Sequence, residues 1–235
     1  MRDFSQFDTR RYPTVSVREG YAAWAGHYEG TVDDEMDIRL LARARTVAWA
    51  QMREAVDLAC GSGRIGSWLA QHGVTHIDGV DITPEMMALA KAKGVYRRFI
   101  QADVAHTGLE TGRYDLAVQS LADEHLAELG PLYREAARLT SPNGTFVIVG
   151  YHPHFLMLGI PTHYHRRIDH EPIAIRSYVH LTSDHVKAAH GAGFTLAEMD
   201  ESVVDESWLE KRPKWAHHRD RPVTFLMSWR KAVRA

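Results

Sequence analysis

The chain has 235 residues, of which 45% are hydrophobic, and a formal net charge of −2 at pH 7. This length and composition suit one domain with a sizeable core, and the near-neutral charge excludes any electrostatic argument for nucleic acid or an anionic membrane as partner. The first residues lack the apolar run of a signal peptide, and no later run approaches membrane-spanning length, so we expect a cytoplasmic protein without membrane contacts. The single cysteine, Cys60, excludes an internal disulfide bond.

The N-terminal half is predicted to alternate strands and helices. Apolar residues at helical spacing predict a helix from Glu35 to Met52. The helix after the second strand has Thr83 as N-cap, Pro84 at its first position and Gly94 at its end. Short apolar runs predict five strands, at residues 55–60, 76–82, 97–103, 114–121 and 145–151.

The C-terminal half departs from this simple alternation. A helix is expected over residues 124–140 and is followed by a turn at 141–144. Residues 183–190 are expected to be helical, and strands follow at 194–204 and 222–230 with no helix between them. The whole order predicts a doubly wound α/β fold with a Rossmann-like, seven-stranded sheet and an antiparallel final strand.

A glycine-rich stretch follows the first strand. Gly61 to Gly66 reads Gly-x-Gly-x-x-Gly, and Asp81 follows Gly61 by 20 residues. This spacing is typical of dinucleotide binding. Asp81 would end the second strand, where it is placed to accept hydrogen bonds from two ribose hydroxyls. Both dinucleotides and S-adenosylmethionine need a glycine loop and such an acid, so these features alone leave both open.

Four details favour S-adenosylmethionine. Asp57 stands just before the loop, where it would repel a pyrophosphate and attract an ammonium or sulfonium group. Asp103 ends the third strand, in position to accept from an adenine amine. About fifty residues precede the first strand, whereas a dinucleotide fold usually starts there. The final pair of strands also does not suit a six-stranded parallel dinucleotide sheet.

Five motifs carry a family resemblance. The chain resembles the class I S-adenosylmethionine-dependent methyltransferases, and most of all their small-molecule branch of the ubiquinone and menaquinone biosynthesis type. The matching motifs cover roughly residues 55–150 and read VDLACGSGR, GVDITPEMM, FIQADV, YDLAVQSLADEHL and YREAARLTSPNGTFVIV. The resemblance implies S-adenosyl-L-methionine as cofactor, S-adenosyl-L-homocysteine as product, and one domain divided into an N-terminal lid (1–50), a cofactor-binding core (51–150), a substrate cap (151–181) and a C-terminal helix and strand pair (182–235).

The resemblance also implies roles for individual residues. The methionine end of the cofactor would meet Asp57 and the loop residues Ala59, Cys60, Gly61 and Gly63. Asp81 would hold the ribose, and the adenine would meet Ile82, Asp103 and the Val104 amide. The sulfonium would lie near Gln119 and Ser120, and the aromatic residues folded over the cofactor would be Tyr21 and Tyr28.

The acceptor end is less determined. Asp123 and Glu124 stand where this branch usually has an apolar residue and a histidine, so that end of the pocket is expected to be more acidic. His125 is either a base or orienting group for the acceptor, or a structural residue at a helix start. The segment 151–181 is too long for an ordinary loop. We expect it to contact the substrate through some of its aromatic and histidine residues, unless it is a packed lobe or a dimer surface; the candidates are His152, His154, Phe155, His163 and Tyr178.

The sequence thus predicts an enzyme that transfers a methyl group from S-adenosylmethionine to a small, aromatic or heteroaromatic acceptor by in-line displacement. The acceptor atom is left open among O, N and C. Histidine pairs at 152/154 and 163/165 have no cysteine companions, and no metal is expected. A homodimer is compatible with the sequence. The alternatives are a non-catalytic sensor or assembly protein that binds S-adenosylmethionine, and an NAD(P)-dependent oxidoreductase.

Overall fold

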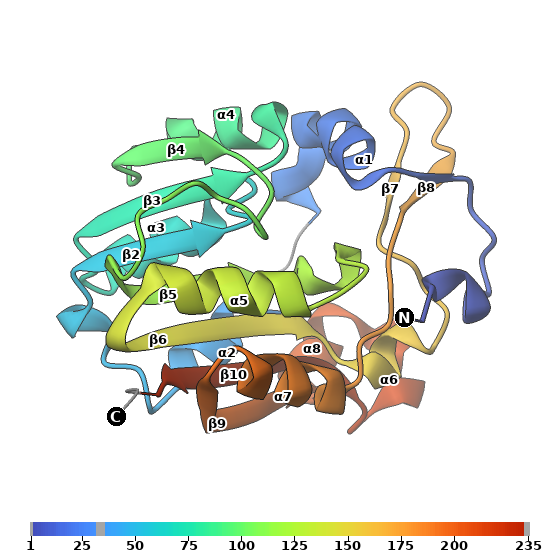
Figure 1. Ribbon diagram of the computed structural model, residues 1–235. Helices are drawn as coiled ribbons and strands as arrows, with labels where there is room; N and C mark the ends of the chain where they lie inside the picture. The colour runs from blue at the N-terminus through green and yellow to red at the C-terminus, as the bar shows by residue number, and fades with distance from the viewer. Residues whose placement is uncertain (1, 32–35, 233–235) are drawn as a thin grey trace.

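A seven-stranded sheet forms the body of the molecule (Figure 1). The computed structural model describes residues 2–31 and 36–232. The strand order is β4-β3-β2-β5-β6-β10-β9, with parallel pairing from β4 through β6. β10 is antiparallel to both β6 and β9. The antiparallel final strand is therefore confirmed, and it lies inside the sheet, between β6 and β9. The strands of this sheet are β2 (Glu54–Leu58), β3 (His76–Asp81), β4 (Arg98–Gln101), β5 (Tyr114–Ser120), β6 (Thr140–Tyr151), β9 (Phe194–Val203) and β10 (Pro222–Lys231).

Helices cover both faces of this sheet because its central strands are apolar on both sides. On β5, Ala117 belongs to the core on one face, while Leu116 and Val118 belong to the core on the other. The first face packs against α5 (Gly130–Leu139) and α7 (Thr182–Gly191), which lie in front of the sheet in Figure 1. The opposite face packs against α2 (Ile38–Arg43) and α3 (Arg64–Gln71). The remaining helices are α1 (Val17–Trp24), α4 (Pro84–Ala92), α6 (Pro153–Leu156) and α8 (Glu206–Lys211).

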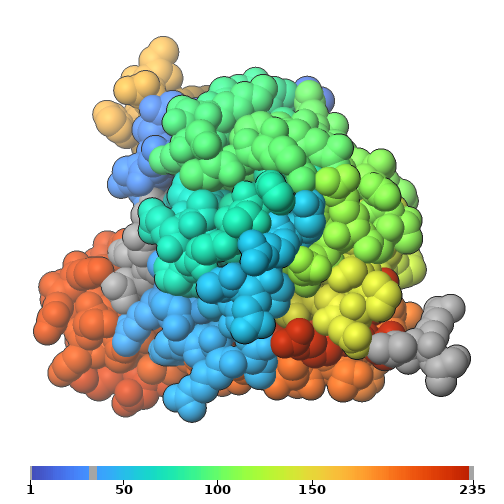
Figure 2. Space-filling model, turned by 90° about the vertical axis from the view of Figure 1, so that its left-hand side faces the viewer, coloured from blue at the N-terminus to red at the C-terminus, as the bar shows by residue number. Residues whose placement is uncertain are grey.

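A second, three-stranded sheet joins the N-terminal segment to the segment after β6. β1 (Thr14–Val15) runs parallel to β8 (Pro172–Ile175), which pairs antiparallel with β7 (His163–His165). An aromatic and aliphatic cluster that includes Trp24 and Tyr164 packs α1 against this sheet. The loop between β7 and β8 projects from the body in both views (Figures 1 and 2). The segments expected to be a lid and a cap are thus packed together as one unit.

The local structure departs from the expected pattern at four places. The helix expected from Glu35, which lies outside the described residues, to Met52 is reduced to α2 and a 3-10 turn at Trp49–Gln51. The helix expected over 124–140 begins only at Gly130. Residues 141–144 lie within the bounds of β6, but its register with β5 skips from Thr140 to Thr145, and Asn143 has the positive φ of a turn. The last two strands are separated by α8 and a 3-10 helix at Pro213–His218.

The topology places a crevice at the carboxyl ends of β2, β3 and β5. β2 has β3 on one side and β5 on the other, so the chain leaves β2 in one direction and returns to its other side later. Ligands in open α/β sheets bind at such a switch point. Among the described residues, no helix is long and apolar enough to cross a membrane.

Candidate functional site

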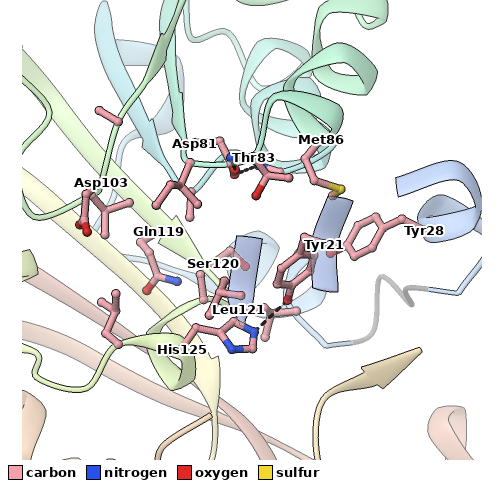
Figure 3. Close-up of a pocket in the computed structure, with 18 residues that line it drawn as sticks. Tyr21, Tyr28, Asp81, Thr83, Met86, Asp103, Gln119, Ser120, Leu121 and His125 are labelled. Atoms are coloured by element: carbon pink, nitrogen blue, oxygen red, sulfur yellow. Dashed lines mark hydrogen bonds between the residues drawn. The ribbon is translucent and has the colours of Figure 1, made fainter. Parts of the chain in front are cut away.

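A cavity of about 220 Å³ opens at this switch point. The carboxyl ends of the strands form its floor, and α1 with the turn that follows it closes the opposite side (Figure 3). Asp81, Asp103 and Gln119 lie toward one end, and Tyr21, Tyr28 and His125 lie toward the other (Figure 3). The wall is formed by Val17, Tyr21, Tyr28, Ala59, Gly61, Asp81, Ile82, Thr83, Met86, Ala102, Asp103, Val104, Gln119, Ser120, Leu121, Ala122, His125 and Leu126.

Two residues of the cavity wall have a strained backbone conformation. Ala59 has φ +60° and Leu121 has φ +50°. Side chains other than glycine rarely adopt this conformation, and for a bulky residue it is an outlier that the surrounding structure must impose. Ala59 follows β2 and Leu121 follows β5, so both strained residues stand where a parallel strand ends at the cavity. Strain of this kind is common at functional sites.

The Asp81 carboxylate is fixed at the end of β3. Its Oδ2 accepts from the Gly61 N–H at 2.8 Å, and its Oδ1 accepts from the Thr83 N–H at 2.8 Å. Burial raises its pKa, and these backbone donors counteract that effect. Each carboxylate oxygen accepts more than one hydrogen bond, so lone pairs remain for two hydroxyls. Ile82, next in the chain, lines the cavity and is 41% exposed although it is a large apolar residue.

Asp57 lies behind the glycine loop and not in the cavity wall. It is 1% exposed. Its Oδ2 accepts from the Tyr96 hydroxyl at 2.6 Å, and its Oδ1 has no hydrogen-bond donor among the described residues. Burial raises the pKa of Asp57 to about 7. A buried carboxylate without full pairing is costly, so this one favours a positive charge near the loop.

Tyr21 and His125 meet at the other end of the cavity. The Tyr21 hydroxyl lies 2.9 Å from His125 Nε2, and His125 Nδ1 lies 2.7 Å from the Arg176 carbonyl oxygen. A carbonyl only accepts, so Nδ1 carries the proton, and Nε2 accepts the hydrogen bond from Tyr21. Burial lowers the pKa of His125 to about 4, and burial raises that of Tyr21 well above its usual value. The pair is therefore neutral at pH 7.

Two acids stand immediately before His125. Glu124 is 1% exposed, and its Oε1 lies 3.5 Å from His125 Nε2. Burial, with the neighbouring Asp123, raises the pKa of Glu124 to about 8. Asp123 turns the other way, with its Oδ2 3.4 Å from Nε2 of the buried His185. The acidic character expected beside His125 is therefore present, but these carboxyls lie behind the wall and do not line the cavity.

The structure brings most of the predicted cofactor residues together. Asp57 in β2 and the loop residues Cys60 and Gly63 do not line the cavity. Burial raises the pKa of the Cys60 thiol far above its usual range, which suits an inert packed residue. The predicted residues that line the cavity are Tyr21, Tyr28, Ala59, Gly61, Asp81, Ile82, Asp103, Val104, Gln119, Ser120 and His125.

None of the five residues expected to contact substrate lines the cavity. His152 Nε2 pairs with Glu201 at 3.0 Å, and Phe155 stacks between Tyr151 and Trp215. His154 is exposed, His163 packs against Tyr12, and the Tyr178 N–H donates to the Glu124 carbonyl. The contacts of His152, Phe155 and His163 are with other parts of the protein and not with the cavity.

Sequence reasoning missed part of the wall. Met86, in α4, is 2% exposed and lines the cavity beside Thr83. Leu121, Ala122 and Leu126 add an apolar surface around His125. Met86 belongs to the GVDITPEMM motif, so its place in the family pattern was a usable signal. The apolar residues near His125 belong to the YDLAVQSLADEHL motif and carried the same signal. Among the described residues, no group of three His, Cys, Asp or Glu side chains is arranged to hold a metal ion.

Comparison with known families identifies the central segment. A family described as "Methyltransferase domain" matches residues 56–148. The matched segment runs from within β2 to within β6 and provides every cavity residue except Val17, Tyr21 and Tyr28. Its fold is the class I fold predicted from the motifs.

Two characterised relatives and two solved structures illustrate the similarity. The malonyl-[acyl-carrier protein] O-methyltransferase of Legionella pneumophila is 27% identical over 58% of this chain and 50% of its own length. The ubiquinone biosynthesis O-methyltransferase of Azorhizobium caulinodans is 29% identical over 40% of this chain and 38% of its own length. An S-adenosylmethionine-dependent methyltransferase structure from Mesorhizobium loti superposes with a TM-score of 0.66 and 24% sequence identity. The superposition covers 84% of this chain and 98% of that one. The DhpI–SAH complex superposes with a TM-score of 0.65 and 18% sequence identity, and the superposition covers 91% of this chain and 94% of that one.

These similarities have a defined extent. The chain spans about half the length of the curated relatives it matches. The segment that matches the family model, residues 56–148, contains the glycine loop, Asp81, Asp103 and His125. The similarity therefore supports the cofactor site most directly, and S-adenosylmethionine is the cofactor of the matched class.

The residues present fit that cofactor. The Asp81 carboxylate is held rigidly at the cavity floor with free lone pairs, and Asp103 and the exposed Ile82 stand beside it. The unpaired Oδ1 of Asp57 lies behind the loop at the predicted methionine end. A dinucleotide would bring an anionic pyrophosphate toward the same buried carboxylate, which electrostatic repulsion disfavours. The donor set and the charge therefore match a cationic adenosine cofactor.

Proposed function

We propose that this protein transfers the methyl group of S-adenosylmethionine to a small aromatic or heteroaromatic acceptor, with Tyr21 and His125 as the proton-handling pair. The observation that carries the proposal is the 2.9 Å contact between the Tyr21 hydroxyl and His125 Nε2 in the wall of the cavity. When bound, the cofactor supplies an electrophilic methyl group on a sulfonium. The protein's task is to place a nucleophile in line with that group.

The cofactor end would be held by residues that are already oriented. Asp81 would accept hydrogen bonds from the ribose hydroxyls, while Asp103 and the Val104 N–H would contact the adenine edge. The Gln119 amide is oriented so that its side-chain oxygen accepts a hydrogen bond from the Ala122 N–H at 2.7 Å. This hydrogen bond fixes the chain at the end of β5. Ser120 follows at the position proposed to lie near the sulfonium. Preorganised groups of this kind cost little reorganisation on binding.

The acceptor end combines a polar pair with an apolar wall. Leu121, Ala122 and Leu126 exclude water around His125, and Tyr28 packs edge-on to Tyr21 with ring centroids 6.0 Å apart. A flat acceptor fits such a surface. An acceptor O–H or N–H that replaces the Tyr21 hydroxyl at Nε2, or that donates to the Tyr21 oxygen, would pass its proton toward a neutral imidazole. His125 can accept that proton because burial keeps it unprotonated at neutral pH.

The experiment is a transfer assay with methyl-deuterated S-adenosylmethionine and a panel of phenols, hydroxyquinolines, indoles and imidazoles. Mass spectrometry would follow both the labelled product and S-adenosylhomocysteine. We expect at least one member of the panel to accept the labelled methyl, with loss of that product in Tyr21→Phe and His125→Gln. Tight cofactor binding without a labelled product across the panel would favour a non-catalytic sensor over the enzyme.

A further inference from the structure

Three glycines from three different segments surround the ring of Tyr96. Gly63 belongs to the loop after β2, Gly66 to α3 and Gly79 to β3. A Cβ atom would approach Tyr96 ring atoms to 3.1 Å at Gly63, 2.2 Å at Gly66 and 3.0 Å at Gly79. Contacts under 3.0 Å do not occur between a real Cβ and a rigid ring, so at Gly66 only the absence of a side chain makes room for the tyrosine.

The Tyr96 hydroxyl contacts Asp57, the buried acid behind the cofactor loop. It donates to Asp57 Oδ2 at 2.6 Å, and Gly79 is the register partner of Asp57 in the β2–β3 pairing. The tyrosine therefore reaches Asp57 through a slot whose walls are glycines. Tyr96 itself comes from the segment between α4 and β4, and its ring packs against Phe99 with centroids 4.8 Å apart.

From this geometry we propose that Tyr96 is a positioning residue of the cofactor site, which holds Asp57 and the glycine loop in the arrangement that binds the positively charged end of S-adenosylmethionine. The inference rests on the cofactor assigned under the proposed function. It also gives Gly66 a role that the Gly-x-Gly-x-x-Gly spacing did not suggest. The third glycine makes room for a tyrosine and does not line the cavity.

The hydrogen bond has an electrostatic consequence. Burial raises the pKa of Asp57 to about 7, and the Tyr96 hydroxyl opposes that rise. The Gly66 N–H also lowers the pKa of Asp57. The other groups that face Asp57 are Asp81, Asp37 and Cys60, and none of them carries a positive charge. Without the tyrosine hydroxyl, Asp57 would bind its proton at higher pH. A cationic ligand favours the ionised acid, so its affinity should then require a higher pH.

The test is calorimetric titration of S-adenosylmethionine from pH 6 to 9 on the full chain carrying Tyr96→Phe. We expect affinity at pH 7 to fall about tenfold, the order expected for a lost hydrogen bond to a charged group, and the pH at which affinity is half-maximal to rise. The matched control is Tyr114→Phe, because the Tyr114 hydroxyl donates to the buried Asp78 at 2.7 Å, away from the loop. The control should keep the wild-type affinity and pH profile. Ionisation of the ligand itself affects all variants equally, so it does not change the comparison between them.

A second variant tests the slot without removing a polar group. Gly66→Ala must displace the Tyr96 ring, and we expect the same weakening and the same shift of the pH profile. Gly191→Ala, at a glycine with no neighbour within 4 Å, is its control. If Tyr96→Phe and Gly66→Ala both match wild type in affinity and profile, Tyr96 does not position the site. If wild type itself fails to bind S-adenosylmethionine, the proposed function fails instead, so the two failures are distinguishable.

Discussion

His125→Gln should change how stability depends on pH, because the account requires a neutral histidine in the cavity wall. The folded protein holds the pKa of His125 at about 4, below its ordinary value of 6.5. The unfolded chain therefore binds a proton between these two values and the folded chain does not. Protonation then favours unfolding, so wild type should lose stability as the pH falls from 6.5 to 4 and level off below 4.

The magnitude follows from the two pKa values. Each pKa unit is worth about 1.4 kcal/mol, so the contribution of His125 to the loss between pH 6.5 and pH 4 is about 3 kcal/mol. Glutamine keeps a side chain that can hydrogen-bond with the Arg176 carbonyl but does not titrate. The variant should therefore lose about 3 kcal/mol less stability than wild type over this interval. This expectation holds even if the two proteins differ in stability at pH 7.

The assay is urea unfolding followed by circular dichroism at several pH values between 4 and 7.5. The exposed His190 provides a control, since His190→Gln should follow the wild-type curve. Other buried histidines contribute equally to both proteins and cancel in the difference. If His125→Gln and wild type lose the same stability on acidification, the folded protein does not lower the pKa of His125, and the burial argument for this residue is refuted.

Three further outcomes are expected. Tyr21→Phe removes the donor to His125 Nε2 and should lower the single-turnover rate by about 10²- to 10⁴-fold while cofactor affinity stays within about threefold; a rate within threefold of wild type would remove Tyr21 from the mechanism. Between pH 6 and pH 9, Glu124→Gln should lose less stability than wild type. The folded state favours the protonated Glu124, so wild type loses stability as the pH rises through about 8. Parallel curves of stability against pH would contradict a protonated Glu124. Asp81→Asn should weaken S-adenosylhomocysteine binding at least about tenfold by calorimetry, and equal affinity would show that Asp81 does not hold the ribose.

The cofactor half of the site was predictable from sequence. The carboxyl ends of neighbouring parallel strands meet at one edge of a sheet, so residues that follow successive strands converge. Asp81 and Asp103 each follow a short apolar run, and the glycine loop precedes a helix. Local patterns of this kind are enough to place the cavity. Val17 and Met86 in its wall come from helices whose orientation the strand pattern does not fix.

The acceptor half depends on contacts between distant segments. Tyr21 and His125 are 104 residues apart, and their hydrogen bond exists because α1 is held over the cavity by the small sheet and its apolar cluster. The histidines of the segment after β6 lie outside the cavity wall for the same reason. Their types suit a site, but their packing partners, such as Glu201 for His152, come from a strand about fifty residues later.

Tertiary contacts also overrode a helical pattern. The apolar period from Met36 to Met52 continues past the end of α2, yet the chain becomes extended at Ala44. The backbone N–H groups of Arg45 and Thr46 both donate to Glu198 Oε2, at 2.9 Å each. An acid on β9 thus provides the acceptor that a continuing helix would otherwise supply. No local propensity in this stretch predicts such a partner.

Calorimetric titration of the wild-type chain with S-adenosylmethionine and, separately, with NAD⁺ tests the central claim most directly. We expect one S-adenosylmethionine site per chain, competed by S-adenosylhomocysteine, with no heat from NAD⁺ and with binding weakened at least about tenfold in Asp81→Asn. Binding of NAD⁺ without binding of S-adenosylmethionine, or S-adenosylmethionine binding that Asp81→Asn leaves unchanged, would contradict it.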